Sequence, residues 1–398
     1  MAKITDIRGR KILDSRGNPT LEVDVILDDG AWARASVPSG ASTGTHEAFK
    51  LSDIDKSVSN VEILAQSLRG QDASQQEKID LLMINTDGTP NKENLGANTI
   101  LAISLATAEA QASSLKMPLY RYIAKIFNKD ITTLKIPTPM FNIINGGKHA
   151  DNNLAFQEFM IIPSGQKNFR DKLEEGAKIF HELKDDLHKM GLSVAVGDEG
   201  GFAPKLNTNE EVLEILTSAI QKAGFIPREQ IGIGLDVAAS SIADLAPITY
   251  PLDAFRYYQK IITDYPIILL EDPLAEDDWA GWAKLTANIG NQIKIVGDDI
   301  FTTNPTRLER GIREKSANSI IIKPDQIGTL TETLRTVKMA QESNLSVIVS
   351  HRSGETESTF IADLAVGIGA DFIKSGAPSR GERISKYNQL LRIEEELL

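Results

Sequence analysis

Charged and polar side chains recur through the second half of the chain at intervals of about one strand plus one helix. Carboxylates come first and basic or polar groups follow; in chain order they are Asp236, Glu271, Asp298, Lys323, His351-Arg352-Ser353 and Lys374. Their successive intervals are 35, 27, 25, 28 and 23 residues. Upstream, the run Gly197-Asp198-Glu199-Gly200-Gly201 adds a carboxylate pair. Groups spaced in this way converge on one site if each of them ends a strand of the same barrel.

The three single acids predict a metal site. Carboxylates that meet at one place repel one another unless a cation neutralises them, and oxygen ligands suit Mg²⁺. The chain has no cysteine and only five histidines, so zinc is the weaker expectation. Any one of these acids alone would be better explained as a helix N-cap. Because three acids end consecutive strands, we expect Asp236, Glu271 and Asp298 to hold magnesium.

The basic groups predict an anionic substrate and a base. Arg352 and Lys374 can hold a phosphate or a carboxylate. Lys323 would then lie among cations, namely the metal, Lys374 and Arg352, and like charges lower the pKa of an ammonium group. A neutral lysine beside Mg²⁺ suits removal of a proton next to a carboxylate, because metal charge stabilises the resulting dianion. Considered alone, Lys323 would be interpreted as a strand-end lysine that reaches solvent.

Short apolar runs precede these groups and predict the strands that position them. The runs cover residues 192–196, 231–235, 267–270, 293–296, 319–322, 345–349 and 371–373, and residues 155–162 supply a further candidate. Helical segments separate the runs, which indicates βα units around a parallel sheet. The count favours an α/β fold with a (β/α)8-type TIM barrel, whose strand ends share one mouth. A doubly wound open sheet is the alternative, weakened because no Gly-x-Gly-x-x-Gly follows an early strand.

The N-terminal third has a different pattern, in which antiparallel strands precede helices. Residues 21–27 alternate apolar with polar, Asp28-Asp29-Gly30 is a hairpin turn, and residues 31–37 supply the returning strand. Residues 98–127 are rich in Ala and Leu, with a break at Met117-Pro118, and predict two helices. We therefore expect an N-terminal α+β capping domain over residues 1–130 and a barrel domain over residues 131–398. Residues 135–139 resemble a linker.

Further signals mark the helices and loops. Residues 169–190 predict an amphipathic helix closed by Gly191, and Thr208 with Glu211 predicts a capping box at the start of the next helix. Residues 38–47 are rich in glycine and small polar residues and predict a mobile loop, with a plain surface loop as the alternative. This loop lacks the Lys-Ser/Thr ending of a P-loop, so we reject a nucleotide-binding function.

Composition narrows the function further. The chain has 398 residues and is 41% hydrophobic, which suffices for a large core. Its 55 acidic and 43 basic residues give a net charge of −12, which argues against direct nucleic-acid binding or an anionic membrane surface. The absence of cysteine excludes disulfides and thiolate catalysis. The first residues are too polar for a signal peptide and no apolar stretch is long enough to span a membrane, so we expect a cytoplasmic protein.

Longer motifs carry the most specific signal. They are Asp14-Ser15-Arg16-Gly17-Asn18-Pro19-Thr20, Ser39-Gly40-Ala41-Ser42-Thr43-Gly44, Gly197-Asp198-Glu199-Gly200-Gly201-Phe202-Ala203-Pro204, Lys323-Pro324-Asp325-Gln326-Ile327-Gly328-Thr329 and Ser350-His351-Arg352-Ser353-Gly354-Glu355-Thr356. Together they resemble the signature stretches of the enolase family, in particular its bacterial members, over essentially the whole chain. The resemblance implies a hydro-lyase of glycolysis and gluconeogenesis. Such an enzyme dehydrates 2-phospho-D-glycerate reversibly to phosphoenolpyruvate with two Mg²⁺ per active site.

The resemblance also implies a role for each site residue. Lys323 would be the base, and Glu199 the acid that protonates the departing hydroxyl group. As metal ligands it implies Asp236, Glu271 and Asp298 for one Mg²⁺ and, in the mobile loop, Ser42 for the second. As substrate contacts it implies Arg352 and Ser353 for phosphate, Lys374 for carboxylate, and His149, Gln157, Glu158 and His351.

The expected oligomeric state and location rest on the resemblance alone. It implies a homodimer, with octamers in some members, and leaves open a second pool at the cell surface or outside the cell. Residues 53–61 and 241–253 look shorter than in the family, which affects surface loops but no catalytic position.

Two rival interpretations remain. A related enzyme acting on a non-phosphorylated acid is disfavoured by Arg352 and Ser353, and a binding protein without turnover is disfavoured by the intact acids and lysines.

Overall fold

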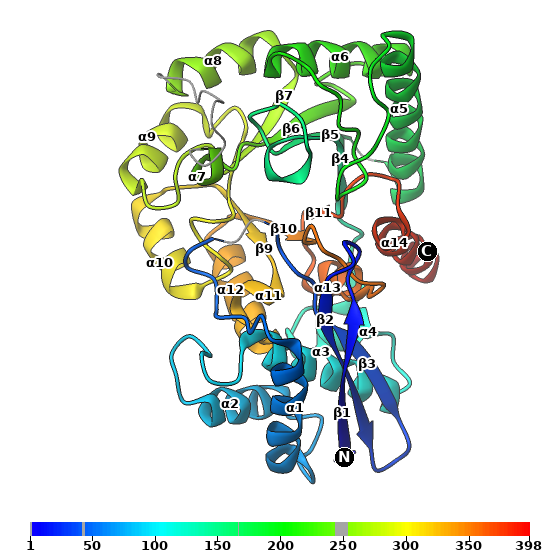
Figure 1. Ribbon diagram of the computed structural model, residues 1–398, viewed down its shortest axis with the longest axis vertical. Helices are drawn as coiled ribbons and strands as arrows, with labels where there is room; N and C mark the ends of the chain where they lie inside the picture. Colours follow the sequence, from blue (N-terminus) through cyan, green and yellow to red (C-terminus); the bar gives the residue numbers. More distant parts are fainter. Residues whose placement is uncertain (1, 42–43, 166, 243–253) are drawn as a thin grey trace.

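The computed structural model describes residues 2–41, 44–165, 167–242 and 254–398. A small antiparallel sheet and a closed barrel lie toward opposite ends of the long axis, with helices between and around them (Figure 1). The predicted metal ligand Ser42 and most of the segment 241–253 lie outside the described residues.

In the described part of the chain the small sheet has three strands, in the order β1 (Ile4–Leu13), β2 (Pro19–Leu27) and β3 (Trp32–Ser36). β2 and β3 pair antiparallel around the predicted turn, which confirms the hairpin. The sequence pattern does not predict β1, because its apolar residues do not alternate regularly and only Ile4 and Ile7 are buried.

A layer of helices follows the small sheet: α1 (Ile54–Leu68), α2 (Gln76–Asp87), α3 (Ala97–Ser114) and α4 (Leu119–Ile126). Pro118 is the N-cap residue of α4, which confirms the predicted break between two helices. α3 is buried on nearly every side, because it lies between the small sheet and the barrel. It contacts β2 and β3 on one side and α11 (Pro324–Ile327) on the other.

Within the described residues, eight strands close the barrel in the order β10-β11-β4-β5-β6-β7-β8-β9. They are β4 (Thr138–Asn145), β5 (Glu158–Pro163), β6 (Ile231–Asp236), β7 (Ile267–Glu271), β8 (Lys294–Gly297), β9 (Ser319–Ile322), β10 (Ser346–Ser350) and β11 (Phe372–Lys374). The predicted fold class, a TIM-type barrel with a separate N-terminal α+β part, is confirmed. One strand departs from an all-parallel barrel, because β5 runs antiparallel to both β4 and β6.

Two details of the strand prediction are wrong. Residues 192–196 run as a loop with a single bridge from Val196 to Phe202, and the Val196 side chain is 40% exposed. The linker expected at residues 135–139 ends inside β4, the strand that takes the place expected for residues 192–196. A short apolar run looks the same in a strand and in an extended loop, so the pattern alone could not separate them.

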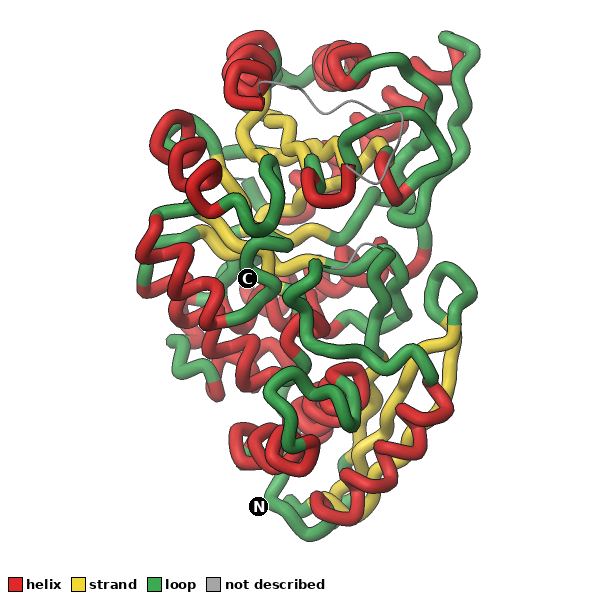
Figure 2. Tube along the Cα trace, turned by 60° about the vertical axis from the view of Figure 1, so that its left-hand side comes forward, coloured by secondary structure: helices red, strands yellow, loops and turns green. Residues whose placement is uncertain are grey.

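Helices surround the barrel (Figure 2). Besides α11, these are α5 (Phe169–Lys189), α6 (Asn209–Lys222), α7 (Ala239–Ile242), α8 (Ala254–Asp264), α9 (Trp279–Ile289), α10 (Pro305–Glu314), α12 (Leu330–Glu342), α13 (Phe360–Ile368) and α14 (Gly381–Leu397), with the 3₁₀ helices η1 (Ile131–Thr133) and η2 (Gly147–His149) in loops. The predicted helix ends are confirmed. The Glu211 N–H donates to the Thr208 hydroxyl at 3.1 Å, and Gly191 follows α5 with a φ of 72°. Among the described residues, no helix is long and apolar enough to cross a bilayer.

The barrel interior is filled by apolar side chains that form a cluster separate from the main core. Its buried members are Met140, Met160, Ile162, Leu269, Val296, Ile321 and Ile348. Successive side chains of a strand point to opposite faces, so these residues mark the inward faces of β4, β5, β7, β8, β9 and β10. A residue two positions further along a strand therefore points into the same interior, nearer its end.

One carboxyl group of the helical layer is partly buried beside another. Glu109 of α3 lies near Asp363 of α13, which accepts hydrogen bonds from the Tyr120 N–H and the Gln389 side chain, each at 3.2 Å. Burial, reinforced by the charge of Asp363, raises the pKa of Glu109 to about 8. The folded chain therefore keeps a proton on Glu109 that the unfolded chain releases above about pH 4.3. Its stability falls as the pH rises toward 8.

Glu109→Gln removes this titration and keeps the shape of the side chain. We expect the variant to melt a few degrees above the wild type at pH 8, and the difference to shrink at pH 5, where the folded wild type is already protonated at Glu109. Differential scanning calorimetry at both pH values measures the effect. Glu93→Gln, at an exposed position, is the matched control. An equal gain at the two pH values would contradict the assignment.

Candidate active site

The predicted site residues lie at one end of the barrel, and strand geometry explains why. Three of them stand two positions beyond an inward apolar residue of the same strand; the pairs are Leu269 and Glu271, Val296 and Asp298, and Ile321 and Lys323. Antiparallel β5 reverses this relation, since Glu158 stands two positions before the inward Met160. The barrel mouth therefore receives the ends of the parallel strands and the start of β5.

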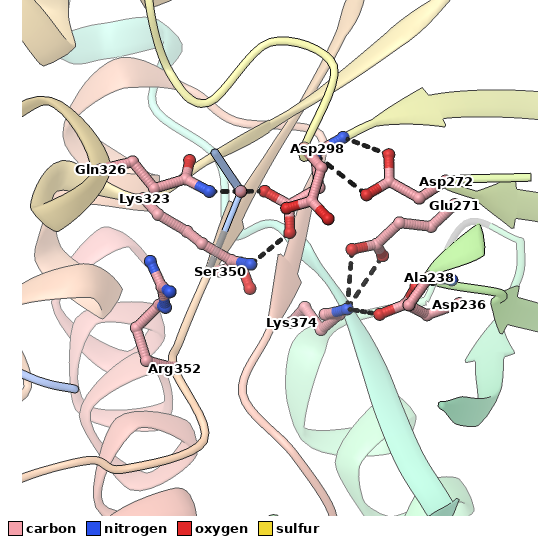
Figure 3. Close-up of polar contacts among 12 residues, drawn as sticks. Asp236, Ala238, Glu271, Asp272, Asp298, Lys323, Gln326, Ser350, Arg352 and Lys374 are labelled. Atoms are coloured by element: carbon pink, nitrogen blue, oxygen red, sulfur yellow. Dashed lines mark hydrogen bonds and ion pairs between the residues drawn. The ribbon is translucent and has the colours of Figure 1, made fainter. Parts of the chain in front are cut away.

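A buried lysine holds the acids of β5, β6 and β7 together, and Figure 3 shows its contacts with Asp236 of β6 and Glu271 of β7. The Lys374 ammonium group lies 2.9 Å from both carboxylate oxygens of Glu271, 3.4 Å from Asp236 and 3.0 Å from Glu158. Burial and the charge of Asp236 raise the pKa of Glu271 well above its ordinary value. Burial lowers the pKa of Lys374, but the surrounding acids outweigh it and raise that pKa well above its ordinary value. This cluster therefore holds more acid than one ammonium group can neutralise.

Asp298 has its own set of contacts. Its carboxylate pairs with the Lys323 ammonium group and accepts a hydrogen bond from the Gln326 side chain at 2.8 Å. Asp272 accepts from the backbone N–H groups of Asp298 and Asp299, each at 2.9 Å, and so fixes the turn after β8. The Lys323 side chain is only 12% exposed. The interpretation of Lys323 as a solvent-facing lysine is therefore wrong.

The charge state of Lys323 in this structure differs from the one expected. The sequence argument expects a lowered pKa, whereas the pKa is raised. Burial lowers it, but the charge of Asp298 outweighs burial. The expected lowering presupposes a metal ion on the acids, which would compete with Lys323 for the Asp298 carboxylate.

The acids fit a hard divalent cation by their chemistry. Asp236, Glu271 and Asp298 are buried carboxylates at three consecutive parallel strand ends, and Lys374 already places a positive charge between two of them. Carboxylate oxygens are the ligands that Mg²⁺ prefers. The predicted triad must rearrange before it can share one ion. In the described ranges, the groups whose ligand atoms all lie within 4.8 Å are instead His46 with Glu276 and Asp277, His149 with Glu158 and Glu199, and Asp272 with Asp298 and Asp299.

Glu199 is held by an amide and two histidines. The Asn142 side chain donates to it at 2.7 Å, and His149 Nδ1 and His351 Nε2 each lie 3.5 Å from its Oε1. Burial raises the pKa of Glu199, but the histidines outweigh burial and bring it well below its ordinary value. Glu158 shifts in the other direction, because burial and the charge of Glu199 raise its pKa to about 8. Glu199 is therefore ionised at neutral pH while Glu158 retains a proton.

Several buried polar atoms at the mouth lack a hydrogen-bond partner among the residues that the structure describes. They include His149 Nδ1, Gln157 Oε1 and His351 Nε2. These residues line one small cavity together with Glu158, Glu199, Asp236, Lys323, Ser350, Arg352, Ser353 and Lys374. A buried polar group without a partner is costly. The cavity is therefore suited to a polar ligand that supplies those partners.

Arg352 is held in place by acids from both parts of the chain. Its guanidinium group lies 3.0 Å from Glu47, in the N-terminal part, and 2.9 Å from Asp325, in the barrel part. Lys50 pairs with the same two acids, at 2.8 and 2.6 Å. Arg352 is 3% exposed, so these ion pairs are shielded from solvent.

Residues 38–47 lie against the mouth at both of their described ends. The Ala41 N–H donates to the Ser353 hydroxyl at 2.6 Å, and Ser39 and Gly354 exchange two backbone hydrogen bonds of 2.7 and 2.8 Å. On the far side, His46 Nε2 lies 3.1 Å from Asp277. The structure thus brings the predicted loop to the predicted site.

Two sequence models of known families match the chain. The model described as "Enolase, N-terminal domain" matches residues 4–123, and the model described as "Enolase, C-terminal TIM barrel domain" matches residues 133–398. The chain belongs to the enolase family. It is therefore a lyase of the enolase superfamily, and enolases generally use Mg²⁺.

Sequence reasoning missed several residues that shape this enolase-family site. Asn142 lies in β4, the strand that was mistaken in part for a linker. Asp272 directly follows Glu271, and Gln326 lies three positions after Lys323. Both are close enough to predicted strand ends that their positions could have identified them. Arg383 of α14 is fully buried beneath the mouth, although a basic residue in a helix ordinarily indicates a solvated face.

Mg²⁺ binding by this site should be visible as thermal stabilisation. We expect the Tm of the wild type to rise with MgCl₂, because a ligand that binds only the folded chain stabilises it. Glu271→Gln should lose most of that rise. Glu309→Gln, at an exposed position of α10, is the control and should keep it. The measurement is a melting curve in MgCl₂ against NaCl of equal ionic strength, and equal rises in all three proteins would rule out the predicted ligand.

Proposed function

We propose that the chain catalyses the reversible dehydration of 2-phospho-D-glycerate to phosphoenolpyruvate and water. The observation that carries this proposal is that Lys323, Glu199, Lys374 and Arg352 line one small cavity. A base, an acid and two cations suit a substrate that loses a carbon-bound proton and a hydroxyl group and carries two anionic groups. Membership of the enolase family supports the same reaction.

Lys323 is the proposed base, which removes the proton next to the substrate carboxylate. Its ion pair with Asp298 keeps it protonated in this structure, so the base form requires Asp298 to be engaged by another cation. Arg352 and Lys374 both lower the pKa of Lys323 and thus favour its neutral form once that ion pair is broken. In the reverse direction Lys323 returns the proton to carbon.

Glu199 is the proposed acid. The carbon–oxygen bond breaks, its electron pair leaves with the hydroxyl oxygen, and that oxygen takes a proton from Glu199 to become water. The proton is available nearby, since His149 Nδ1 lies 3.5 Å from Glu199 and 3.6 Å from the protonated Glu158. An anionic substrate raises the pKa of Glu199, because like charges disfavour ionisation. Substrate binding therefore favours transfer of the proton to Glu199.

The anionic groups of the substrate have proposed anchors. Arg352 and Ser353 bind phosphate and Lys374 binds carboxylate, while His149, Gln157 and His351 supply the remaining polar contacts. Asp236, Glu271 and Asp298 would hold one Mg²⁺, and Ser42 would help to hold a second. Bound there, Mg²⁺ supplies the charge that stabilises the substrate carboxylate as the proton leaves.

The setting of this reaction is also part of the proposal. We propose a division into an N-terminal domain of residues 1–130 and a barrel domain of residues 131–398, supported by family matches over residues 4–123 and 133–398. Family resemblance supports a cytoplasmic homodimer that acts in glycolysis and gluconeogenesis.

The test of the function is direct. Purified chain is mixed with 2-phospho-D-glycerate and MgCl₂, and phosphoenolpyruvate is followed by its near-ultraviolet absorbance. We expect the absorbance to rise with Mg²⁺ and to stay flat after treatment with a chelator. A flat trace with the metal present would refute the proposal.

Two variants separate the base from the acid. Lys323→Ala should lose exchange of the substrate α-proton with solvent deuterium by at least ~10²-fold, the usual contribution of a general base, while Mg²⁺ still raises its Tm. Glu199→Gln should lose dehydration to a similar extent and keep part of the exchange. Proton NMR measures exchange and absorbance measures dehydration. Normal exchange in Lys323→Ala, or equal loss of both activities in Glu199→Gln, would contradict these roles.

A further inference from the structure

Arg383 is a fully buried arginine that contacts both halves of the site. It lies in the first turn of α14 and is 0% exposed. Its guanidinium group donates to the backbone carbonyls of Asp198 at 2.9 Å, Arg352 at 2.6 Å and Ser353 at 2.6 Å. It therefore ties the residue before the proposed acid to the residues proposed to bind phosphate. All three contacts are with backbone carbonyl groups and not with side chains.

A fourth contact of Arg383 reaches a side chain. Its Nη1 lies 2.6 Å from Nδ1 of His351. A guanidinium group has only donors and stays protonated in proteins, so Nδ1 must be the acceptor and cannot carry a proton. A neutral imidazole has one N–H group, which must then lie on Nε2.

The Nε2 atom of His351 faces the cavity. It lies 3.5 Å from Oε1 of Glu199, and it is one of the buried polar atoms without a hydrogen-bond partner in the described part of the chain. A donor in this position can hydrogen-bond to Glu199 or to a hydroxyl group placed next to it. Because Nδ1 is already engaged by Arg383, the imidazole cannot become doubly protonated while that contact persists.

We propose that Arg383 is a positioning residue that holds His351 as the neutral tautomer with its proton on Nε2, directed at Glu199 and the departing hydroxyl group. The inference rests on the proposed function for the identity of that hydroxyl group. His351 then steadies Glu199 and the leaving oxygen by hydrogen bonding and takes up no proton of its own. The proton that Glu199 delivers is thus reserved for the leaving oxygen.

The charges around His351 agree with a neutral ring. The groups that face it are Glu199 on one nitrogen, Arg383 on the other, and Glu355 nearby. Burial lowers the pKa of His351 to about 4, with Arg383 acting in the same direction and the two acids opposing it. Without the arginine, burial alone would oppose the two acids, and the pKa of His351 would rise.

The tautomer can be measured in the wild type without any assay of activity. Long-range ¹H–¹⁵N spectra of the histidine rings distinguish Nδ1–H, Nε2–H and imidazolium, and the signals of His351 are those that disappear in His351→Asn. We expect Nε2–H from pH 6 to pH 8. A spectrum of Nδ1–H or of imidazolium at pH 7 would overturn the proposal. If the chain formed no phosphoenolpyruvate, this spectrum would still decide the tautomer.

Two variants test the role of the arginine. Arg383→Met should let His351 take a second proton near neutral pH, lower kcat on the order of 10²-fold, and add an ionisation to the acid limb of the pH–rate profile. Arg383→Lys keeps a donor for Nδ1 and should retain the wild-type tautomer. Arg380→Met is the matched control, because Arg380 donates to the carbonyls of Gly197 and Ser15 at 3.1 Å and does not contact the ring.

The outcomes of these variants are decisive in either direction. An imidazolium signal in Arg383→Met, and its absence in Arg383→Lys and Arg380→Met, would support the positioning role. A wild-type tautomer and an unchanged acid limb in a folded Arg383→Met would overturn it, since a merely structural arginine would lower Tm and leave both unchanged. If Arg383→Met does not fold, the wild-type spectrum and Arg383→Lys decide.

Discussion

The mouth of the barrel depends on the balance between buried carboxylates and the two lysines that hold them. Lys374 lies between Glu271 and Asp236, and Lys323 pairs with Asp298. Buried charges are tolerated only when they are paired, so removal of one partner would leave the others uncompensated. If a metal ion bound these acids, it would compete with the lysines for their carboxylates. The proposed metal binding would therefore be linked to the protonation of Lys323 through Asp298.

On the other side of the cavity, two histidines lie against the carboxylate of Glu199. Glu199 is ionised because His149 and His351 face it, and Glu158 keeps its proton because it is buried and lies near the charged Glu199. Two acids that interact this closely titrate as a pair rather than one by one. Arg383 limits the protonation states of the pair by keeping a proton off Nδ1 of His351. On the side of Lys323, the site is thus arranged to release a proton from an ammonium group. On the side of Glu199, it is arranged to transfer a proton between carboxyl groups.

The sequence predicts the positions of the site residues better than their charge states. Strand ends with acids and then lysines could be recognised because the apolar runs and the spacing repeat, and β9 begins and ends where the pattern indicates. Periodicity carries no strand direction, so antiparallel β5 could not be foreseen. A short apolar run also looks the same in a strand and in an extended loop, so the loop at residues 192–196 could not be foreseen either. The raised pKa of Lys323 and the burial of Arg383 depend on which side chains meet in space. Such contacts join residues far apart in the chain, and local sequence does not record them.

The reversed direction of β5 bears on how the barrel assembles. A parallel neighbour needs a crossover helix, whereas β4 and β5 are joined directly by residues 146–157 and pair as adjacent strands. Contacts between segments close in sequence form with a smaller loss of chain entropy than distant ones. The segment that carries His149 and Glu158 is therefore the part of the ring with the most local pairing. We expect β4 and β5 to pair early in folding, before the strands from β6 to β11 close the barrel.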